Sequence, residues 1–157
     1  MITAQIGGGR FFYRAAGVLI DSGRVLLHRA TGDPNWVLPG ERCEFMEEST
    51  DCLRREMREE LGHEVRVVSL LWVVENFFRL DGVPCHEVGL YYLLELSGGS
   101  APDQVPVRGW GDEIELEFRW FNPADLSGLP LVPPFLADRL GRLDPGIERG
   151  VDRRSLV

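Results

Sequence analysis

The sequence predicts an α+β fold, an α/β/α sandwich in which a mixed sheet lies between helices. Apolar, β-rich segments occupy both halves of the 157-residue chain. One amphipathic helix, expected from residue 49 or 50 to the glycine at 62, separates them, and a final helix is expected from Pro133 to about Leu143. With 44% hydrophobic residues, residues 1–157 are expected to form one domain, with its core at about 10–143 and a frayed, charged tail at 144–157.

The first half of the chain reads as a hairpin. Residues 11–20 are β-rich, Asp21-Ser22-Gly23 is typical of a turn, and residues 24–29 return as a second strand. The preceding run Gly7-Gly8-Gly9 is either a flexible lead-in or a tight turn. Residues 36–40 are expected to form a short strand that runs into the central segment.

The segment after the central helix predicts a second hairpin. Residues 65–74 form a long apolar strand pattern, which polar and aromatic residues at 75–78 are expected to interrupt. A turn at Asp81-Gly82 leads into a further strand over residues 87–96.

The last third of the chain contains less regular structure. Residues 97–112 are rich in glycine and proline and lack periodicity, which indicates a long loop. Residues 113–119 alternate between charged and apolar side chains, as a strand with one face in water does. Residues 122–126 are expected to form a short capped helix.

Composition excludes several functions. A net charge of −8 argues against nonspecific binding to nucleic acids or anionic membranes, which depends on cationic side chains. All 17 basic residues are arginines, which excludes lysine chemistry such as a Walker-type phosphate loop. There is no signal peptide and no long apolar run, so a cytoplasmic location is expected. The three cysteines, Cys43, Cys52 and Cys85, are an odd number without metal-ligand spacing, so no disulfide framework is expected. Cys43 and Cys52 are expected to be packing residues, with a catalytic thiol as the alternative, and the three histidines are too scattered for a metal site.

The central helix carries two adjacent stripes at helical spacing. The apolar stripe consists of Leu53, Met57 and Leu61, and the acidic stripe of Glu56, Glu59 and Glu60. Like charges at this spacing repel by roughly 0.2–0.5 kcal/mol per pair, so a cation is expected to offset them. Hard oxygen ligands suit Mg²⁺ or Mn²⁺, and Arg55 lies where it can steady one carboxylate. The alternative is a solvated charged face.

The segment that begins at Gly40 resembles the signature of the Nudix hydrolase family, G-x5-E-x7-R-E-U-x-E-E-x-G-U, where U is a bulky apolar residue. Glu47, seven intervening residues and the run 55–62 match it without a gap. The opening glycine is replaced by Glu41, and the closing apolar position is His63. Met46 stands where members commonly carry glycine. Glu41 and Met46 therefore lie in an altered loop or tolerate strain, and we expect the Glu41 side chain to point to solvent.

The resemblance implies a Nudix-type sandwich that hydrolyses a pyrophosphate bond with Mg²⁺ or Mn²⁺. By the same resemblance, Glu56 and Glu60 are metal ligands and Glu59 is a ligand or a base. Arg55 then orients Glu56, and Glu47 braces the loop or the helix. The backbone carbonyl of Gly40 is the candidate that completes the metal site.

Family members commonly add one carboxylate from outside the signature, near the end of the sheet. Here Glu115 is favoured, with Glu113 second and Glu87 a rival on another strand. The alternative is that such residues only line the wet face of a strand. Arg29 is a candidate contact for substrate phosphate, or else a surface arginine.

Base recognition needs aromatic platforms, for which Phe77 and Phe78 are the candidates, together with Tyr13 and Trp36. Each of these aromatics is alternatively part of the core. The substrate is expected to be a nucleoside tri- or diphosphate or a related nucleotide. The alternatives are a nucleotide sugar of the ADP-ribose type or a noncatalytic ligand-binding domain. The retained signature carboxylates disfavour the last reading, and homodimerisation is left open.

Overall fold

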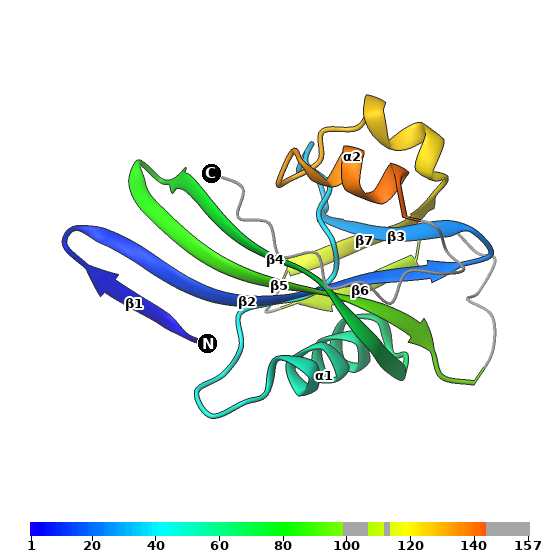
Figure 1. Ribbon diagram of the computed structural model, residues 1–157, viewed down its shortest axis with the longest axis horizontal. Coiled ribbons are helices and arrows are strands. Elements are labelled where there is room, and N and C mark those ends of the chain that lie inside the picture. The colour runs from blue at the N-terminus through cyan, green and yellow to red at the C-terminus, as the bar shows by residue number, and fades with distance from the viewer. Residues whose placement is uncertain (99–106, 112–113, 144–157) are drawn as a thin grey trace.

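The computed structural model describes residues 1–98, 107–111 and 114–143, and within them the chain forms one seven-stranded sheet flanked by helices (Figure 1). The strands are β1 (Thr3–Ile6), β2 (Gly9–Asp21), β3 (Arg24–Ala30), β4 (Val65–Leu80), β5 (Val83–Leu96), β6 (Val107–Gly111) and β7 (Ile114–Phe121). The helices are α1 (Ser49–Leu61), the 3₁₀ helix η1 (Pro123–Gly128) and α2 (Leu136–Gly141).

The sheet is mixed, as the sequence predicted. Its order is β4-β5-β2-β3-β7-β6, and β1 pairs with β2. β2 and β5 run parallel, and the other described pairs are antiparallel. Figure 1 shows α1 on one face of the sheet and η1 with α2 on the other, which is the expected sandwich.

β2 and β3 separate soon after the turn that joins them, and this separation creates room for the site. Their ladder contains only the pairs Ile20–Val25 and Asp21–Arg24. The segment 36–42 fills the gap through backbone hydrogen bonds to both strands. These bonds join Gly17 N to Pro39 O (2.8 Å), Ala15 N to Glu41 O (3.0 Å) and His28 N to Val37 O (2.9 Å). The loop that precedes α1 is therefore fixed to the middle of the sheet.

Each face of the sheet has its own apolar core. On the α1 face, Leu53 and Met57 pack with sheet residues such as Leu94 and Phe118. On the other face, Leu136 and Leu140 of α2 pack against residues such as Trp72 and Tyr91. The three cysteines are buried and form no disulfide, and Cys43 and Cys52 lie in the core on the α1 face, in agreement with their expected packing role.

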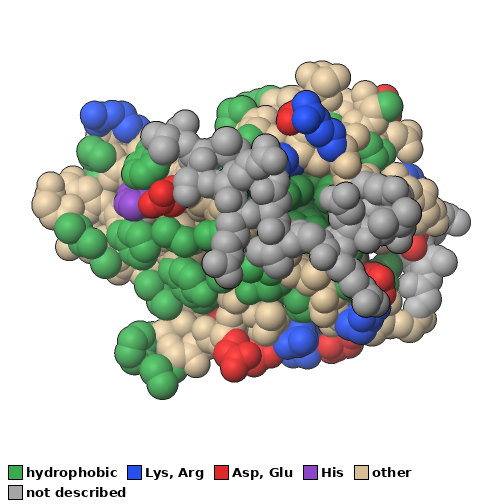
Figure 2. Space-filling model, viewed as in Figure 1, with side chains coloured by type: hydrophobic (Ala, Val, Ile, Leu, Met, Phe, Trp, Pro, Cys, Tyr) green, Lys and Arg blue, Asp and Glu red, His purple; other side chains and the backbone are tan. Residues whose placement is uncertain are grey.

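Helix α1 begins and ends where the sequence predicted. Its C-cap, Gly62, adopts φ = 73°, a left-handed conformation that glycine reaches without strain. The Gly62 and His63 amides donate to the carbonyls of Arg58 (3.0 Å) and Met57 (3.2 Å), which satisfies carbonyls at the helix end. Along its exposed edge α1 presents acidic and basic side chains (Figure 2).

Two strand predictions were wrong in extent. The expected interruption at residues 75–78 does not occur, because β4 continues to Leu80 and Phe77 and Phe78 pair in register with His86 and Cys85. Residues 36–40 form isolated bridges instead of a strand, since they lie between strands that have already diverged.

The remaining differences lie near the ends of the chain. Part of the expected loop, residues 107–111, is strand β6, and residues 99–106 and 112–113 lie outside the described part. The short helix after β7 is a 3₁₀ helix, and α2 begins at Leu136, after both prolines. The tail at 144–157 also lies outside the described residues.

The N-terminal strand β1 was not predicted. Gly7 and Gly8 have φ = 54° and 82° and form the two-residue turn between β1 and β2, so the tight-turn reading of the glycine run was correct. In the described part of the chain, no helix has the length and apolar character to cross a membrane.

Candidate active site

Arg55 connects the loop before α1 to the acidic stripe of the helix. Its Nε and Nη2 atoms donate to the two carboxylate oxygens of Glu47 at 2.8 and 3.1 Å. Its Nη1 atom donates to Glu56 and also to Glu59, the latter at 3.2 Å. A guanidinium has five donors in a fixed plane, so one side chain can hold three carboxylates in one arrangement.

An acidic cavity of about 330 Å³ opens beside this group. Five carboxylates line it, namely Glu41 and Glu44 from the loop and Glu56, Glu59 and Glu60 from α1. Glu44 is paired with the N-terminal ammonium group of Met1. Ile114 and Leu116 of β7 and His28 of β3 form part of its opposite wall. The acidic stripe of the helix therefore faces a cavity as well as bulk water, which favours the cation-site reading over a purely solvated face.

Glu56 is the most enclosed carboxylate of this cavity, with an exposed fraction of 6%. Burial raises its pKa above the ordinary value, and the charges of Glu41 and Glu59 raise it further, although Arg55 opposes both effects. Glu47 shows the reverse, since its hydrogen bonds from Arg55 hold its pKa below the ordinary value. Arg55 thus favours the charged form of Glu47, whereas the same guanidinium does not fully offset the burial of Glu56.

Steric crowding explains why position 40, just before the signature, is a glycine. Gly40 has φ = 135°, and a Cβ atom there would lie 2.2 Å from the carbonyl oxygen of Ala15. Its own carbonyl oxygen accepts a hydrogen bond of 2.9 Å from Nη2 of Arg14. Gly40 is not among the residues that line the acidic cavity, so this structure does not bring its carbonyl to the carboxylates there.

The two departures in the signature loop differ in their consequences. Met46 adopts φ = 68° and is 87% exposed, so it accepts the strained conformation that glycine would adopt freely. Glu41 has no such strain, and its carboxylate accepts hydrogen bonds from N and Nε of Arg42 at 2.8 and 3.0 Å. The expectation that Glu41 points to solvent was wrong, because anchoring to Arg42 keeps its carboxylate at the cavity.

Glu115, the favoured downstream carboxylate, is not among the residues that line the acidic cavity. Leu116 and Phe118 pack in the core on the α1 face, so the alternation of β7 directs Glu115 to the opposite face. There Glu115 accepts a hydrogen bond of 3.1 Å from Thr31. Glu113 lies outside the described residues. Arg29 pairs with Glu117 at 2.9 Å and lies over Trp36, and it lines neither this cavity nor the one described next.

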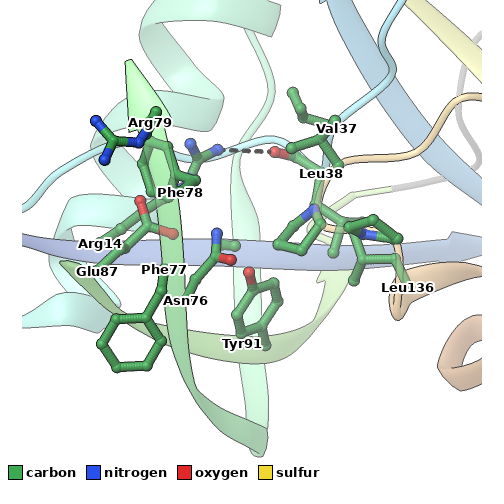
Figure 3. Close-up of a pocket in the computed structure, with 14 residues that line it drawn as sticks. Arg14, Val37, Leu38, Asn76, Phe77, Phe78, Arg79, Glu87, Tyr91 and Leu136 are labelled. Atoms are coloured by element: carbon green, nitrogen blue, oxygen red, sulfur yellow. Dashed lines mark hydrogen bonds between the residues drawn. The ribbon is translucent and has the colours of Figure 1, made fainter. Parts of the chain in front are cut away.

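A second cavity, of about 430 Å³, lies on the α2 side of the sheet (Figure 3). Figure 3 shows the polar ends of Arg14, Asn76, Glu87 and Tyr91 on its sheet side, with Leu38 and Leu136 across from them. The rest of its wall consists of Ala16, Val37, Phe77, Phe78, Arg79, Val132, Pro133 and Pro134. Glu87 belongs to this cavity and is therefore not a rival ligand in the acidic one.

The aromatic candidates divide between this cavity and the core. Phe78 stacks on Phe12 with ring centroids 6.1 Å apart, and Phe77 stacks on His86 at 4.4 Å. Both phenylalanines contribute to the wall of the second cavity, but adjacent strand residues point to opposite faces, so of the two it is Phe78 that lies on the face of Asn76 and Glu87, as a base platform would. Tyr13 packs against the α1-face core and Trp36 is buried against Phe121, so these two are core residues.

The donor set of the acidic cavity fits a hard divalent cation. Carboxylate oxygens are the ligands that Mg²⁺ and Mn²⁺ take, and a cation there would favour the charged form of Glu56, which burial disfavours. Among the described residues, no three carboxylate, histidine or cysteine side chains already stand in metal-binding geometry. Ion binding therefore requires glutamate side chains to turn toward one another within the cavity.

Sequence reasoning missed Arg14 and underrated His28. Arg14 interrupts an apolar strand segment, Tyr13-Arg14-Ala15-Ala16, and a charge in such a pattern is a usable signal. His28 is 7% exposed, and neither ring nitrogen has a hydrogen-bond partner within the described residues. Burial, aided by the charge of Arg14, lowers the pKa of His28 to about 4, so the ring is neutral near pH 7.

A family model for the NUDIX domain matches residues 12–141. Among solved structures, a MutT NUDIX hydrolase from Burkholderia pseudomallei is 24% identical, with a TM-score of 0.64 over 85% of this chain and 98% of that one. An ADP-ribose pyrophosphatase from Streptococcus suis is 19% identical, with a TM-score of 0.63 over 92% and 98%. A UDP-X diphosphatase is 18% identical, with a TM-score of 0.55 over 77% of this chain. This chain spans 54% of that protein.

Proposed function

The chain belongs to the NUDIX family, whose domain model matches most of its length, and from this premise we propose that it is a metal-dependent pyrophosphohydrolase of nucleotides. The substrate class that we favour is a nucleoside tri- or diphosphate. The observation that carries the proposal is the acidic cavity, in which Glu41 joins the three signature carboxylates of α1.

We assign the metal to Glu56, Glu59 and Glu60, with Mg²⁺ or Mn²⁺ as the ion. When bound, the ion neutralises phosphate charge and makes a water molecule a better nucleophile. Arg55 holds Glu56 and Glu59 in position and is itself fixed by Glu47. Its hydrogen bonds therefore link the loop to the helix. Glu59, whose side chain is 58% exposed, is the carboxylate best placed to accept a proton from water.

The second cavity supports the nucleotide part of the proposal. Its volume lies within the range of about 300–1,000 Å³ that small-molecule sites occupy, and Phe78 offers a face on which a base can stack. The segment 36–42 connects the two cavities, since Leu38 lines the second and Glu41 the acidic one. A ligand with a base at one end and phosphates at the other matches this arrangement.

A nucleotide sugar of the ADP-ribose type is the second candidate. The favouring observation is the similarity in fold to an ADP-ribose pyrophosphatase from Streptococcus suis. A noncatalytic role is disfavoured because the signature carboxylates are present and line a cavity.

The test is a panel of nucleoside triphosphates, nucleoside diphosphates and ADP-ribose, incubated with Mg²⁺ or Mn²⁺ and analysed for products by mass. We expect metal-dependent release of phosphate or pyrophosphate from at least one nucleotide, with a nucleoside monophosphate or diphosphate as the other product. Hydrolysis that survives chelation of the metal, or turnover of ADP-ribose alone, would contradict the proposal in its favoured form.

A further inference from the structure

Glu87 is a buried acid in the second cavity that the proposed chemistry does not use. It lies in the middle of the sheet on β5, with an exposed fraction of 8%. Within the described residues, its carboxylate has no hydrogen-bond donor and no ion-pair partner in contact. Its oxygen atoms are not sealed off by protein atoms, so they face the second cavity, and a carboxylate there needs hydrogen-bond donors from whatever fills the cavity. This carboxylate therefore points to a ligand that brings the donors.

Arg14 explains how the acid is tolerated in the absence of such a ligand. Burial favours the neutral form of the Arg14 guanidinium, but nearby acidic groups, Glu87 first among them, together raise its pKa above the ordinary value. Arg14 donates hydrogen bonds to the carbonyls of Leu38 (3.2 Å) and Gly40 (2.9 Å) rather than to Glu87. The charge of Glu87 is thus balanced at a distance, while its oxygen atoms remain available to accept hydrogen bonds.

Asn76 stands directly beside Glu87. The two residues are opposite each other in the antiparallel ladder of β4 and β5, so their side chains emerge as neighbours on one face. Both line the second cavity, and within the described residues the Asn76 side-chain amide forms no hydrogen bond. A carboxylate accepts two hydrogen bonds and the adjacent amide can donate one. The pair therefore offers two acceptors next to one donor.

We propose that Glu87 and Asn76 read the Watson–Crick edge of a guanine-type base, an inference that rests on the proposed nucleotide hydrolase function. Guanine presents N1–H and N2–H₂ side by side as donors, with O6 next to them as an acceptor. The Glu87 carboxylate matches the two donors and the Asn76 amide matches O6. Phe78, which lines the same cavity, supplies an apolar face for the ring.

The same chemistry disfavours the other bases. Adenine and cytosine each place an unprotonated ring nitrogen next to their amino group, and this lone pair would face a carboxylate oxygen. Uracil and thymine flank their single N–H with two carbonyl oxygens, which carboxylate oxygens repel. A site with buried acceptors rejects ligands that leave those acceptors unpaired. The penalty on the other bases therefore contributes to specificity as much as the hydrogen bonds to guanine do.

The first experiment measures kcat/KM of the wild-type protein for GTP, dGTP, ITP, ATP, CTP and UTP with saturating Mn²⁺. Inosine keeps N1–H but lacks the 2-amino group, so ITP tests one of the two donors. We expect GTP and dGTP to be equivalent and to exceed ITP about tenfold and ATP about 100-fold, the range for loss of one or two such hydrogen bonds. The difference should lie mainly in KM, because the base is remote from the reacting phosphate.

The second experiment uses Glu87→Gln, which keeps the side-chain shape and replaces one acceptor with a donor. We expect kcat/KM for GTP to fall about 10- to 100-fold, while kcat/KM for ATP rises, because a carboxamide can pair with the amino group and N1 of adenine. Glu95→Gln is the matched control, since Glu95 lies on the same strand and is paired on the surface with Arg66. It should leave the order of preference unchanged.

Loss of the Glu87 charge can also destabilise the fold, so the Tm of each variant is measured. Asn76→Leu provides an independent variant that leaves the Glu87–Arg14 balance intact, and it should lower kcat/KM for GTP about tenfold. Calorimetric binding of GMP and AMP without metal gives a readout that does not depend on turnover. Tighter binding of GMP than of AMP by the wild type, weakened in both variants, supports the inference.

The failures of the two proposals are distinguishable. If nucleotides are hydrolysed but GTP and ATP differ by less than threefold, the base-reading inference is wrong and the hydrolase proposal stands. If GTP is preferred over dGTP and the bases are equivalent, Glu87 binds the ribose, and the inference is again wrong. If no nucleotide is hydrolysed while GMP is bound selectively, the inference holds and the hydrolase proposal fails.

Discussion

The Nη2 atom of Arg14 donates a hydrogen bond of 2.9 Å to the carbonyl oxygen of Gly40, and this bond joins the two cavities of the protein. Arg14 lines the cavity on the α2 side, and Gly40 precedes Glu41 of the acidic cavity. A hydrogen bond to a charged donor stabilises by roughly 1.5–3 kcal/mol. The position of the loop at Gly40 is therefore coupled to the second cavity. Changes at Gly40 should therefore affect both sites.

Replacing Gly40 with alanine tests this coupling. The new Cβ atom would lie 2.2 Å from Ala15 O, at a φ of 135° that alanine rarely adopts. We expect a loss of about 3 kcal/mol or more in the free energy of unfolding, from clash and strain together, and a weaker metal-induced rise in Tm. Gly32→Ala is the matched control. Gly32 has φ = 91° with open space around it, so only the strain of about 1 kcal/mol should appear. Equal losses in both variants would argue against a clash.

Replacing Glu56 or Glu60 with glutamine should remove activity and keep the fold. Each change deletes one ligand charge while preserving shape, so we expect turnover to fall at least ~10²-fold. Without metal, Glu56→Gln should raise the Tm, because burial and neighbouring carboxylates already disfavour the charge of Glu56. Steady-state kinetics and thermal unfolding of the same samples provide the measurement. Turnover within threefold of the wild type would remove these residues from the metal site.

Acid should destabilise the protein through His28. Its pKa is about 4 in the folded protein and 6.5 in an unfolded chain, so the unfolded state binds more protons between these values. Stability from the neutral ring is complete above pH 6.5 and is lost as the pH falls to about 4, by about 3 kcal/mol in total. Urea unfolding at several pH values measures this loss. His28→Phe keeps a ring against Phe118 and should flatten the profile in that window. An unchanged profile would assign the acid sensitivity to other groups.

The parts of the fold that the sequence predicted are those set by local rules. Helix α1 was placed correctly because its apolar stripe has helical period and Gly62 supplies the C-cap. The hairpin of β2 and β3 was placed by the Asp21-Ser22-Gly23 turn. Strand β6 was not predicted, because its residues lack alternation and only pairing with β7 makes them a strand.

The candidate site divides in the same way. Glu56, Glu59 and Glu60 share a helix, so their spacing alone brings them together. Glu115 was favoured as a metal ligand, but it lies on the face of β7 away from α1, and the sequence shows that a strand alternates without showing which face meets α1. The second cavity depends on the register of β2, β4 and β5. No local pattern reveals that Arg14, Asn76 and Glu87 become neighbours.

Arg55→Lys tests whether Arg55 acts as a brace. One ammonium group cannot bond both oxygens of Glu47 and also reach Glu56 and Glu59. We expect kcat to fall about tenfold or more, a barrier increase of roughly 1.4 kcal/mol, with the affinity for Mn²⁺ reduced as well. The neighbouring Arg54→Lys serves as control, because Arg54 pairs only with exposed Asp51. If the two substitutions have equal effects, Arg55 acts only as a surface charge and not as a brace.

Glu41, the residue that replaces the signature glycine, should tune the affinity for metal. Arg42 anchors its carboxylate at the acidic cavity, where its charge also acts on Glu56. Removing a half-exposed charge near a cation weakens binding modestly, since solvent and salt screen it. We therefore expect Glu41→Gln to raise the Kd for Mn²⁺ about 3- to 10-fold, a loss of roughly 1 kcal/mol, and to leave kcat at saturating Mn²⁺ within about fivefold.

The measurement for Glu41 is the rise in Tm across a Mn²⁺ titration, because an ion that binds only the folded state stabilises by mass action. Ca²⁺ should also raise the Tm but support little hydrolysis, because its looser coordination positions phosphates poorly. Glu64→Gln is the control for charge alone, since Glu64 lies past the helix end and pairs with Arg58 in solvent. If Glu41→Gln and Glu64→Gln shift the Mn²⁺ titration equally, the effect of Glu41 is long-range charge. If the shift occurs only in Glu41→Gln and excess Mn²⁺ overcomes it, the Glu41 carboxylate lies next to the bound ion. It then takes the place expected for the Gly40 carbonyl, which is hydrogen-bonded to Arg14.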